Sequence, residues 1–165
     1  KRVNEMQVHN SRQQFGTETV LVRFFNTYGP GEWYHPFRSV NCLFTYNLLH
    51  GKPITVFKGH TRTSTYIYDS VRTLANISEN FVDGQTYNIA SDQEHTIEKL
   101  AETLVKYTKA DPSLVDYREH NEILTTKHKH VDASKSVRDL DHKNTVTLEE
   151  GVWETVQWMK EHYRL

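Results

Sequence analysis

Thr19–Phe25 (TVLVRFF) is an almost continuous run of β-branched and aromatic residues. Such a run is typical of a strand covered on both faces, and a parallel sheet beneath helices is the simplest arrangement that covers both. The next residues, Asn26–Pro36 (NTYGPGEWYHP), are too rich in glycine, proline and aromatic residues for regular structure, so we expect a loop there. Ligands of open α/β sheets bind at the carboxyl ends of the strands. The strand therefore also predicts where a functional site lies.

Helical and strand patterns alternate along the rest of the chain, which indicates the α/β class with a small mixed region towards the C-terminus. The expected helices cover residues 1–15, 37–50, 69–79, 97–107 and 148 onward, and their ends are marked by Gly16, Gly51, Asp69, Thr96 and the capping box Thr147–Glu150. Short strands are expected at 54–57 and 87–90, and a polar loop at 58–65.

The composition restricts both the organisation and the class of function. A length of 165 residues fits one domain, but the apolar fraction of 36% is low for a self-contained globule, which indicates a very polar surface or a core of which part is missing. Because the first residue is Lys1 rather than methionine, we expect a piece of a longer chain. Twenty basic against 21 acidic residues give a net charge of −1, which argues against nucleic-acid or anionic-membrane partners. Any phosphate binding must therefore be local.

Two further features concern the environment of the chain. No run approaches 18 apolar residues, so we expect no membrane span. The single cysteine, Cys42, lies among apolar residues and is expected to be a small buried hydrophobe in a reducing compartment, the cytoplasm.

A few polar side chains are candidates for a site. Asn26 follows the first strand and could donate to a phosphate oxygen, although capping the backbone of its own loop is the commoner role. Arg62 and Arg38 could bind a diphosphate, or could be solvated surface residues. Trp153 and Trp158 on the last helix could mark a binding face, but core or subunit-contact positions are commoner for such aromatics.

The ten histidines do not indicate a metal centre. His128 and His130 alternate on what we expect to be an exposed strand, and separate loops or helix ends are expected to hold His35, His50, His60 and His95. Since none of these pairs has a convincing ligand spacing with a carboxylate partner, we expect no metal. A glycine-rich G-x-G-x-x-G fingerprint is also missing from the sequence.

Several blocks together resemble a known family. Arg23–Pro30 (RFFNTYGP) resembles the R-x-F-N-x-Y-G-P signature of extended short-chain dehydrogenase/reductases that modify nucleotide sugars. Blocks similar to other family segments follow in the same order: GKPITV at 51–56, Thr61-Arg62 with YIYD at 66–69, YNIA at 87–90, DASK at 132–135 and LEEG at 148–151. Together and in this order, these blocks are specific to the superfamily, though not to one reaction.

The resemblance implies a fold and a division of the chain. The chain would be the C-terminal part of a Rossmann-type α/β protein, carrying the last strand or strands of the parallel sheet and a small mixed α/β substrate-binding domain. Residues 1–30 would close the Rossmann-type domain, and residues 31–165 would form the substrate-binding domain with returning sheet segments. Lys1 would be the lysine of the family's catalytic Tyr-x-x-x-Lys pair, although the interpretation as a solvated helix-end residue remains open.

The resemblance also implies residue roles. Lys1 would be catalytic and, with Thr27 and Arg38, would bind NAD or NADP. Asn26, Asn41 and Arg62 would bind a nucleotide-diphosphate sugar. The expected protein is a homodimeric NAD(P)-dependent epimerase (an isomerase) or 4,6-dehydratase (a lyase) that acts through a transient 4-keto sugar, and the 165 residues by themselves are expected to be inactive. A decarboxylase of the same family, or a non-catalytic nucleotide-sugar binding or assembly module, remains an alternative.

One departure from the family pattern affects the diphosphate site. Many relatives carry R-P-G-D shortly before the D-x-S-K block, whereas this chain has Ile123–His128 (ILTTKH). Lys127 could substitute as a point charge, or Arg62 could act without it.

Overall fold

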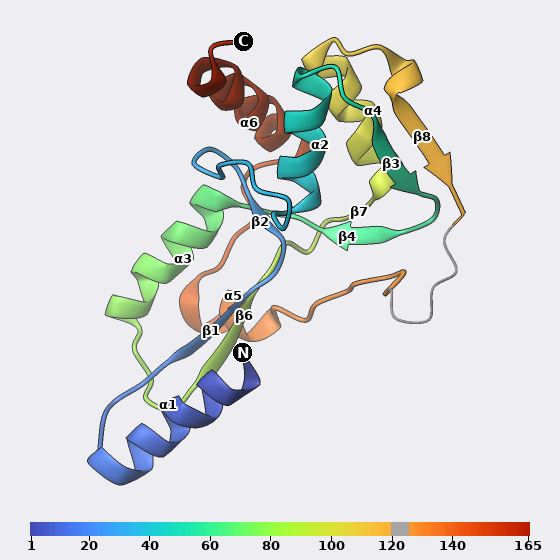
Figure 1. Cartoon of the computed structure of the whole chain (residues 1–165). Helices are drawn as coiled ribbons and strands as arrows, with labels where there is room; N and C mark the ends of the chain where they lie inside the picture. The colour runs from blue at the N-terminus through green and yellow to red at the C-terminus, as the bar shows by residue number, and fades with distance from the viewer. Residues whose placement is uncertain (120–125) are drawn as a thin grey trace.

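The computed structural model describes residues 1–119 and 126–165 (Figure 1). Ile123–Thr125 of the departing segment lie outside the described residues. The helices are α1 (Arg2–Phe15), α2 (Val40–Leu49), α3 (Ile67–Glu79), α4 (Ile97–Thr108), the 3-10 turn η1 (Pro112–Leu114), α5 (Ser134–Leu140) and α6 (Leu148–Tyr163). The strands are β1 (Leu21–Phe24), β2 (Thr27–Tyr28), β3 (Ile54–Phe57), β4 (Thr61–Thr63), β5 (Thr65–Tyr66), β6 (Thr86–Ile89), β7 (Glu94–Thr96) and β8 (Val115–Arg118).

Helices and strands alternate along the chain, and the strands pair largely in parallel, so the α/β prediction is confirmed. β1 pairs with β6, β2 with β5 and β3 with β8 in parallel, whereas β4 and β7 are antiparallel. Within the described residues, none of the helices has the length and apolar character needed to cross a membrane.

Figure 1 shows two groups of elements, a lower lobe and an upper lobe, joined by short strands. The lower lobe contains the pair β1–β6 with α1, α3 and α5, and α5 packs against β6. β1 runs in register with β6 from Leu21 opposite Thr86 to Phe24 opposite Ile89. Phe24 is 45% exposed, so the described elements cover only part of this strand.

The upper lobe holds the main hydrophobic core between α2, α4, α6 and β3. Thr96 caps α4 by accepting a hydrogen bond from the Lys99 amide, and Thr147 with Glu150 forms the predicted capping box of α6. The apolar stripe predicted for α6 is buried at Val152, Val156 and Met159. Cys42 is fully buried in α2, as expected, and burial raises the pKa of its thiol to about 12. Trp153, in contrast, is 49% exposed and does not belong to the core.

Short strands connect the lobes in the segment where a polar loop was expected. The prediction of a loop at 58–65 is wrong, because Thr61–Thr63 pairs with β7 and Thr65–Tyr66 pairs with β2. The β-branched threonines of this segment suit a strand, and Thr63 and Thr65 are fully buried.

Three other local predictions are corrected. The helix expected from Phe37 begins at Val40, after Ser39 accepts the capping hydrogen bond from the Cys42 amide. α3 begins at Ile67 rather than after Asp69, which lies within its first turn. His128 forms a single bridge with Thr61 instead of lying on an exposed strand with His130.

Candidate functional site

Asn26 turns the chain out of β1. Its φ of 46° lies in the left-handed region, which asparagine tolerates better than most residues. Its side-chain Nδ2 donates to the Thr63 carbonyl at 2.9 Å, and its own carbonyl accepts from the Thr65 amide at 3.2 Å. The side chain therefore holds the remote joint between β4 and β5 instead of capping the backbone of its own loop, and Asn26 lies beside the strand that carries Arg62.

The side chain of Thr65 links a third segment to the β4–β5 joint. Its Oγ1 donates to the Phe25 carbonyl at 3.0 Å and accepts from the Ser91 amide at 2.8 Å. The end of β1, the β4–β5 joint and the loop after β6 thus meet at one point. Thr27, next to Asn26, has a buried hydroxyl that forms no hydrogen bond within the described part of the chain.

Arg62 lies on β4 at the wall of a pocket of about 180 Å³. Its Nη1 donates to the carbonyls of Thr61 (2.6 Å) and Lys127 (3.1 Å), and partial burial lowers the pKa of its guanidinium. A guanidinium has five N–H donors, so further donors are available to an anion. The other lining residues are Val40, Phe44, Thr55, Phe57, His60 and Ile97. The pocket is thus largely apolar with one cation at its wall.

Asn41 reaches the same region from the first turn of α2. It is 1% exposed, its Nδ2 donates to Ser64 Oγ at 3.2 Å, and its Oδ1 is buried with no partner among the described residues. Ser64 Oγ also lies 3.2 Å from His95 Nε2. Burial is the main cause that lowers the pKa of His95 to about 4. A polar chain of three side chains therefore runs beside Arg62.

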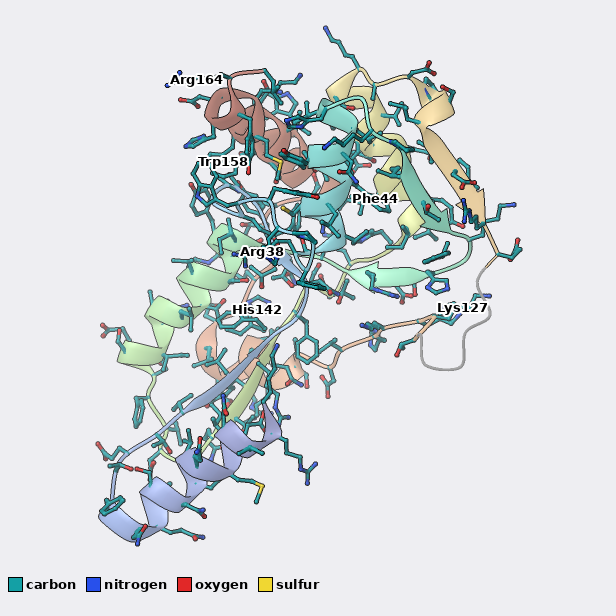
Figure 2. The ribbon with its side chains drawn as sticks, in the orientation of Figure 1. Arg38, Phe44, Lys127, His142, Trp158 and Arg164 are labelled. Carbon is teal, nitrogen blue, oxygen red and sulfur yellow. The ribbon has the colours of Figure 1, made fainter. Side chains whose placement is uncertain are left out.

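The structure does not bring every predicted site residue into this cluster. Lys1 is exposed and lines a separate pocket of about 480 Å³ between α1 and β1. Arg38 is exposed in the loop before α2 (Figure 2). Asn26, Asn41 and Arg62 surround Ser64, with Thr27 directly after Asn26, whereas Lys1 and Arg38 lie outside this group.

Sequence reasoning missed Ser64 and His95. The alternation in TRTST was a period-two signal that would have placed Arg62 and Ser64 on one face of a strand. His95 was assigned to a separate loop, but it lies on β7 directly opposite Arg62. Within residues 1–119 and 126–165, three or more histidine, cysteine or acidic side chains nowhere form a group that could hold a metal ion.

The chain is similar to known proteins over most of its length. The family model described as "NAD dependent epimerase/dehydratase family" matches residues 1–90. The chain is 30% identical over 161 residues to dTDP-glucose 4,6-dehydratase of Salmonella typhimurium (89% of this chain, 42% of the relative). It is 29% identical over 154 residues to UDP-N-acetyl-alpha-D-glucosaminuronate decarboxylase of Bacillus cytotoxicus (88% of this chain, 47% of the relative).

A solved structure extends the likeness to the fold. UDP-glucose 4-epimerase of Thermotoga maritima with UDP-glucose superposes with a TM-score of 0.87 at 25% identity, covering 99% of this chain and 52% of that one. The chain spans about half the length of the curated relatives it matches. Because the family model matches more than half of the chain, the chain belongs to the NAD-dependent epimerase/dehydratase family.

Proposed function

We propose that this chain supplies the nucleotide-sugar binding part of an NAD(P)-dependent epimerase or 4,6-dehydratase that acts through a transient 4-keto sugar. Relatives with epimerase and dehydratase names support the proposal. A decarboxylase of the same family is the second candidate, because a decarboxylase is among the similar relatives.

The observation that carries the proposal is the placement of Arg62. Its guanidinium borders a pocket with aromatic walls from Phe44 and Phe57, and Asn26 and Asn41 lie nearby. Apolar walls suit a nucleotide base, and a guanidinium suits the two phosphates next to it. Binding energy from the nucleotide, which lies away from the reacting sugar carbon, can be used to orient that carbon.

In this proposal the end of a Rossmann-type domain comprises residues 1–30, and the substrate-binding domain comprises residues 31–165. The parallel pairing of β1 with β6 supports the return of part of the second segment to the first domain's sheet. Exposed apolar side chains on α1, Val3 and Met6, offer a surface for the homodimer we propose.

Lys1, Thr27 and Arg38 would hold the nicotinamide cofactor. Thr27 fits because its buried hydroxyl lacks a partner among the described residues, and Lys1 fits because it is exposed beside a pocket that β1 lines. When bound, the cofactor supplies reversible hydride transfer. Lys1 would donate hydrogen bonds to the cofactor, and the positive charge of Lys1 would lower the pKa of a nearby acidic group.

Replacement of Arg62 tests the binding proposal. Calorimetry with UDP-glucose and dTDP-glucose should show that Arg62→Ala lowers affinity by roughly 10- to 100-fold, since a hydrogen bond to a charged group contributes about 1.5–3 kcal/mol. Arg138→Ala is the matched control, because Arg138 is exposed on α5 and pairs with Asp139. Unchanged affinity in Arg62→Ala would show that the diphosphate binds elsewhere.

A product analysis separates the catalytic proposals from a non-catalytic binding module. The 165 residues by themselves should form no product, whereas NMR of reaction mixtures containing the intact protein, NAD and a panel of nucleotide sugars should show epimerised, dehydrated or decarboxylated product. Binding without any product would favour the binding or assembly module.

A further inference from the structure

We propose that His95 is a proton-linked member of the diphosphate site, so that a nucleotide diphosphate bound at Arg62 is accompanied by proton uptake at the His95 imidazole. This inference rests on the proposed function.

The strand register places His95 next to the proposed anion. Arg62 on β4 lies directly opposite His95 on β7, and opposite residues of an antiparallel pair project from the same face. Ser64 follows Arg62 by two residues and therefore shares this face. Ser64 and His95 line a pocket of about 390 Å³, and Arg62 lines a different pocket of about 180 Å³, so a ligand that touches all three would span the two pockets.

The hydrogen bonds define two protonation states. The Gln93 backbone raises the pKa of His95, and because Nε2 lies 3.2 Å from Ser64 Oγ, we assign the contact with Gln93 to Nδ1–H. In the neutral ring Nε2 is then an acceptor, so the Ser64 hydroxyl donates to it while accepting from Asn41 Nδ2. In this state the Ser64 hydroxyl proton is used by His95, so Ser64 offers no proton to a ligand.

Protonation of His95 reverses the second bond. Nε2–H would donate to Ser64 Oγ, which would also accept from Asn41, and the Ser64 hydroxyl proton would be free to turn towards a phosphate oxygen. One proton on His95 therefore gives the site a new hydrogen-bond donor as well as a positive charge. Both changes favour an anion.

The surrounding charges explain why the proton arrives with the ligand. Burial and the charge of Arg62 lower the pKa of His95, whereas Glu149 on α6 and Glu94 beside His95 raise it. Lys99 on α4 engages Glu149 in an ion pair of 3.1 Å. A diphosphate at Arg62 would bring negative charge to the same face, offset the effect of Arg62 and favour the imidazolium. Linkage then requires that affinity increase as pH falls.

Calorimetry on the full chain tests this coupling. UDP-glucose and dTDP-glucose are suitable probes because both of their phosphates are diesters, whereas a terminal phosphate titrates with a pKa of about 6 and would obscure the result. Because a pKa of about 4 leaves His95 largely neutral in the free protein above pH 5, titrations at about pH 5 and about pH 7, each in buffers of low and high ionisation enthalpy, give affinity and proton uptake. We expect roughly 3- to 10-fold tighter binding at the lower pH, with net proton uptake, and neither effect in His95→Gln.

Three other histidine variants locate the proton. His130→Gln is an exposed control, and His60→Gln and His128→Gln replace two other histidines near Arg62, one lining its pocket and one 3.1 Å from the Thr61 hydroxyl. Proton uptake that persists in His95→Gln, or is lost in His60→Gln or His128→Gln instead, overturns the inference. If His95→Gln does not fold, the pKa of His95 is measured instead from its ring NMR resonance in the unsubstituted chain. A pKa that rises when nucleotide sugar binds supports the proposal, and an unchanged pKa overturns it.

The outcomes also separate this inference from the proposed function. If neither nucleotide sugar binds, or if Arg62→Ala leaves the affinity unchanged, the proposed function is wrong and so is this inference. If binding depends on Arg62 but takes up no proton, only the role of His95 is wrong.

Discussion

Arg62, Asn41 and His95 are polar side chains at positions where burial costs free energy. The Oδ1 of Asn41 is buried with no partner among the described residues, and His95 is held where burial disfavours its charged form. A core built only for stability would satisfy these groups or replace them by apolar ones. Polar groups that are only partly satisfied and gathered beside a pocket are therefore better explained by ligand binding.

His95 also makes folding stability depend on pH. Its folded-state pKa is lowered to about 4, below the ordinary value of 6.5, so the unfolded chain binds the proton more readily. The stability from His95 is fully present above about pH 6.5 and is lost as pH falls towards 4, amounting to about 3 kcal/mol. Urea unfolding should give a midpoint that falls across this window in the unsubstituted chain and falls less in His95→Gln. Parallel pH profiles for the two chains would show that His95 is not buried as described.

At the scale of elements, Gly151 sets how closely α6 approaches the pair β2–β5. A Cβ at Gly151 would lie 2.9 Å from both Tyr28 Cζ and Tyr66 Cδ2, in a place where the two rings already pack edge to face at 5.8 Å. Gly151→Ala should therefore destabilise the protein by about 1–3 kcal/mol through overpacking. Glu161→Ala, at an exposed position of the same helix, should change the free energy of unfolding by less than about 0.5 kcal/mol. Equal urea midpoints for the two variants would contradict this packing.

The same scale shows what the sequence could predict. α1, α4 and α6 follow from local signals, since Gly16, Thr96 and the Thr147 capping box mark their ends. β4 and β5 did not follow, because apart from Tyr66 their buried residues are threonines, which give no hydrophobic pattern, and their partner strands are remote in sequence.

Part of the candidate site could likewise be predicted from the sequence, and part could not. Motif resemblance identified Asn26, Asn41 and Arg62 as candidates. Ser64 had a local signal in the alternation of TRTST, whereas His95 joins the site only through the antiparallel register of two segments about 30 residues apart, which local sequence does not specify.

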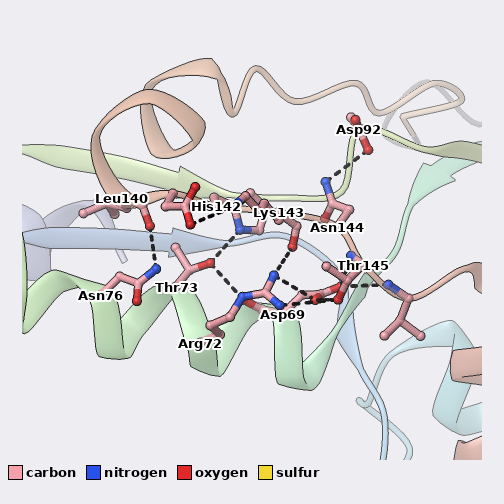
Figure 3. Close-up of polar contacts among 12 residues, drawn as sticks. Asp69, Arg72, Thr73, Asn76, Asp92, Leu140, His142, Lys143, Asn144 and Thr145 are labelled. Carbon is pink, nitrogen blue, oxygen red and sulfur yellow. Dashed lines mark hydrogen bonds and ion pairs between the residues drawn. The ribbon is translucent and has the colours of Figure 1, made fainter.

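At the scale of the whole molecule, buried polar groups hold the segment that joins the lobes. Residues 141–147 lead from α5 in the lower lobe to α6 in the upper lobe, and they lie along α3 (Figure 3). His142 is 1% exposed and bridges the Thr73 hydroxyl (2.7 Å) and the Ala90 carbonyl (2.9 Å). A chain with few apolar residues thus uses hydrogen bonds where another would use a larger core.

Asp69 is the centre of this connection and gives the sharpest test of it. Its carboxylate is 2% exposed and accepts from the Thr145 amide (3.0 Å), the Thr145 hydroxyl (2.6 Å), the Val146 amide (3.3 Å) and Arg72 (3.2 Å). Asp69→Asn would turn an NH₂ group towards some of these donors and leave Arg72 without its charge partner, so it should lower the free energy of unfolding by about 3 kcal/mol. Urea denaturation followed by far-UV circular dichroism measures the loss.

Asp141→Asn is the matched control for this change. Asp141 lies in the same connecting segment, but its side chain is exposed and pairs with Lys143 at 2.8 Å in water, where an ion pair contributes at most about 1 kcal/mol. Asparagine also tolerates the left-handed backbone at this position, where φ is 50°. If burial and the number of donors give Asp69 its importance, the two isosteric substitutions will differ in unfolding midpoint even though each removes one charge. Equal midpoints would mean that α3 and α6 hold the two lobes together by apolar packing without this carboxylate.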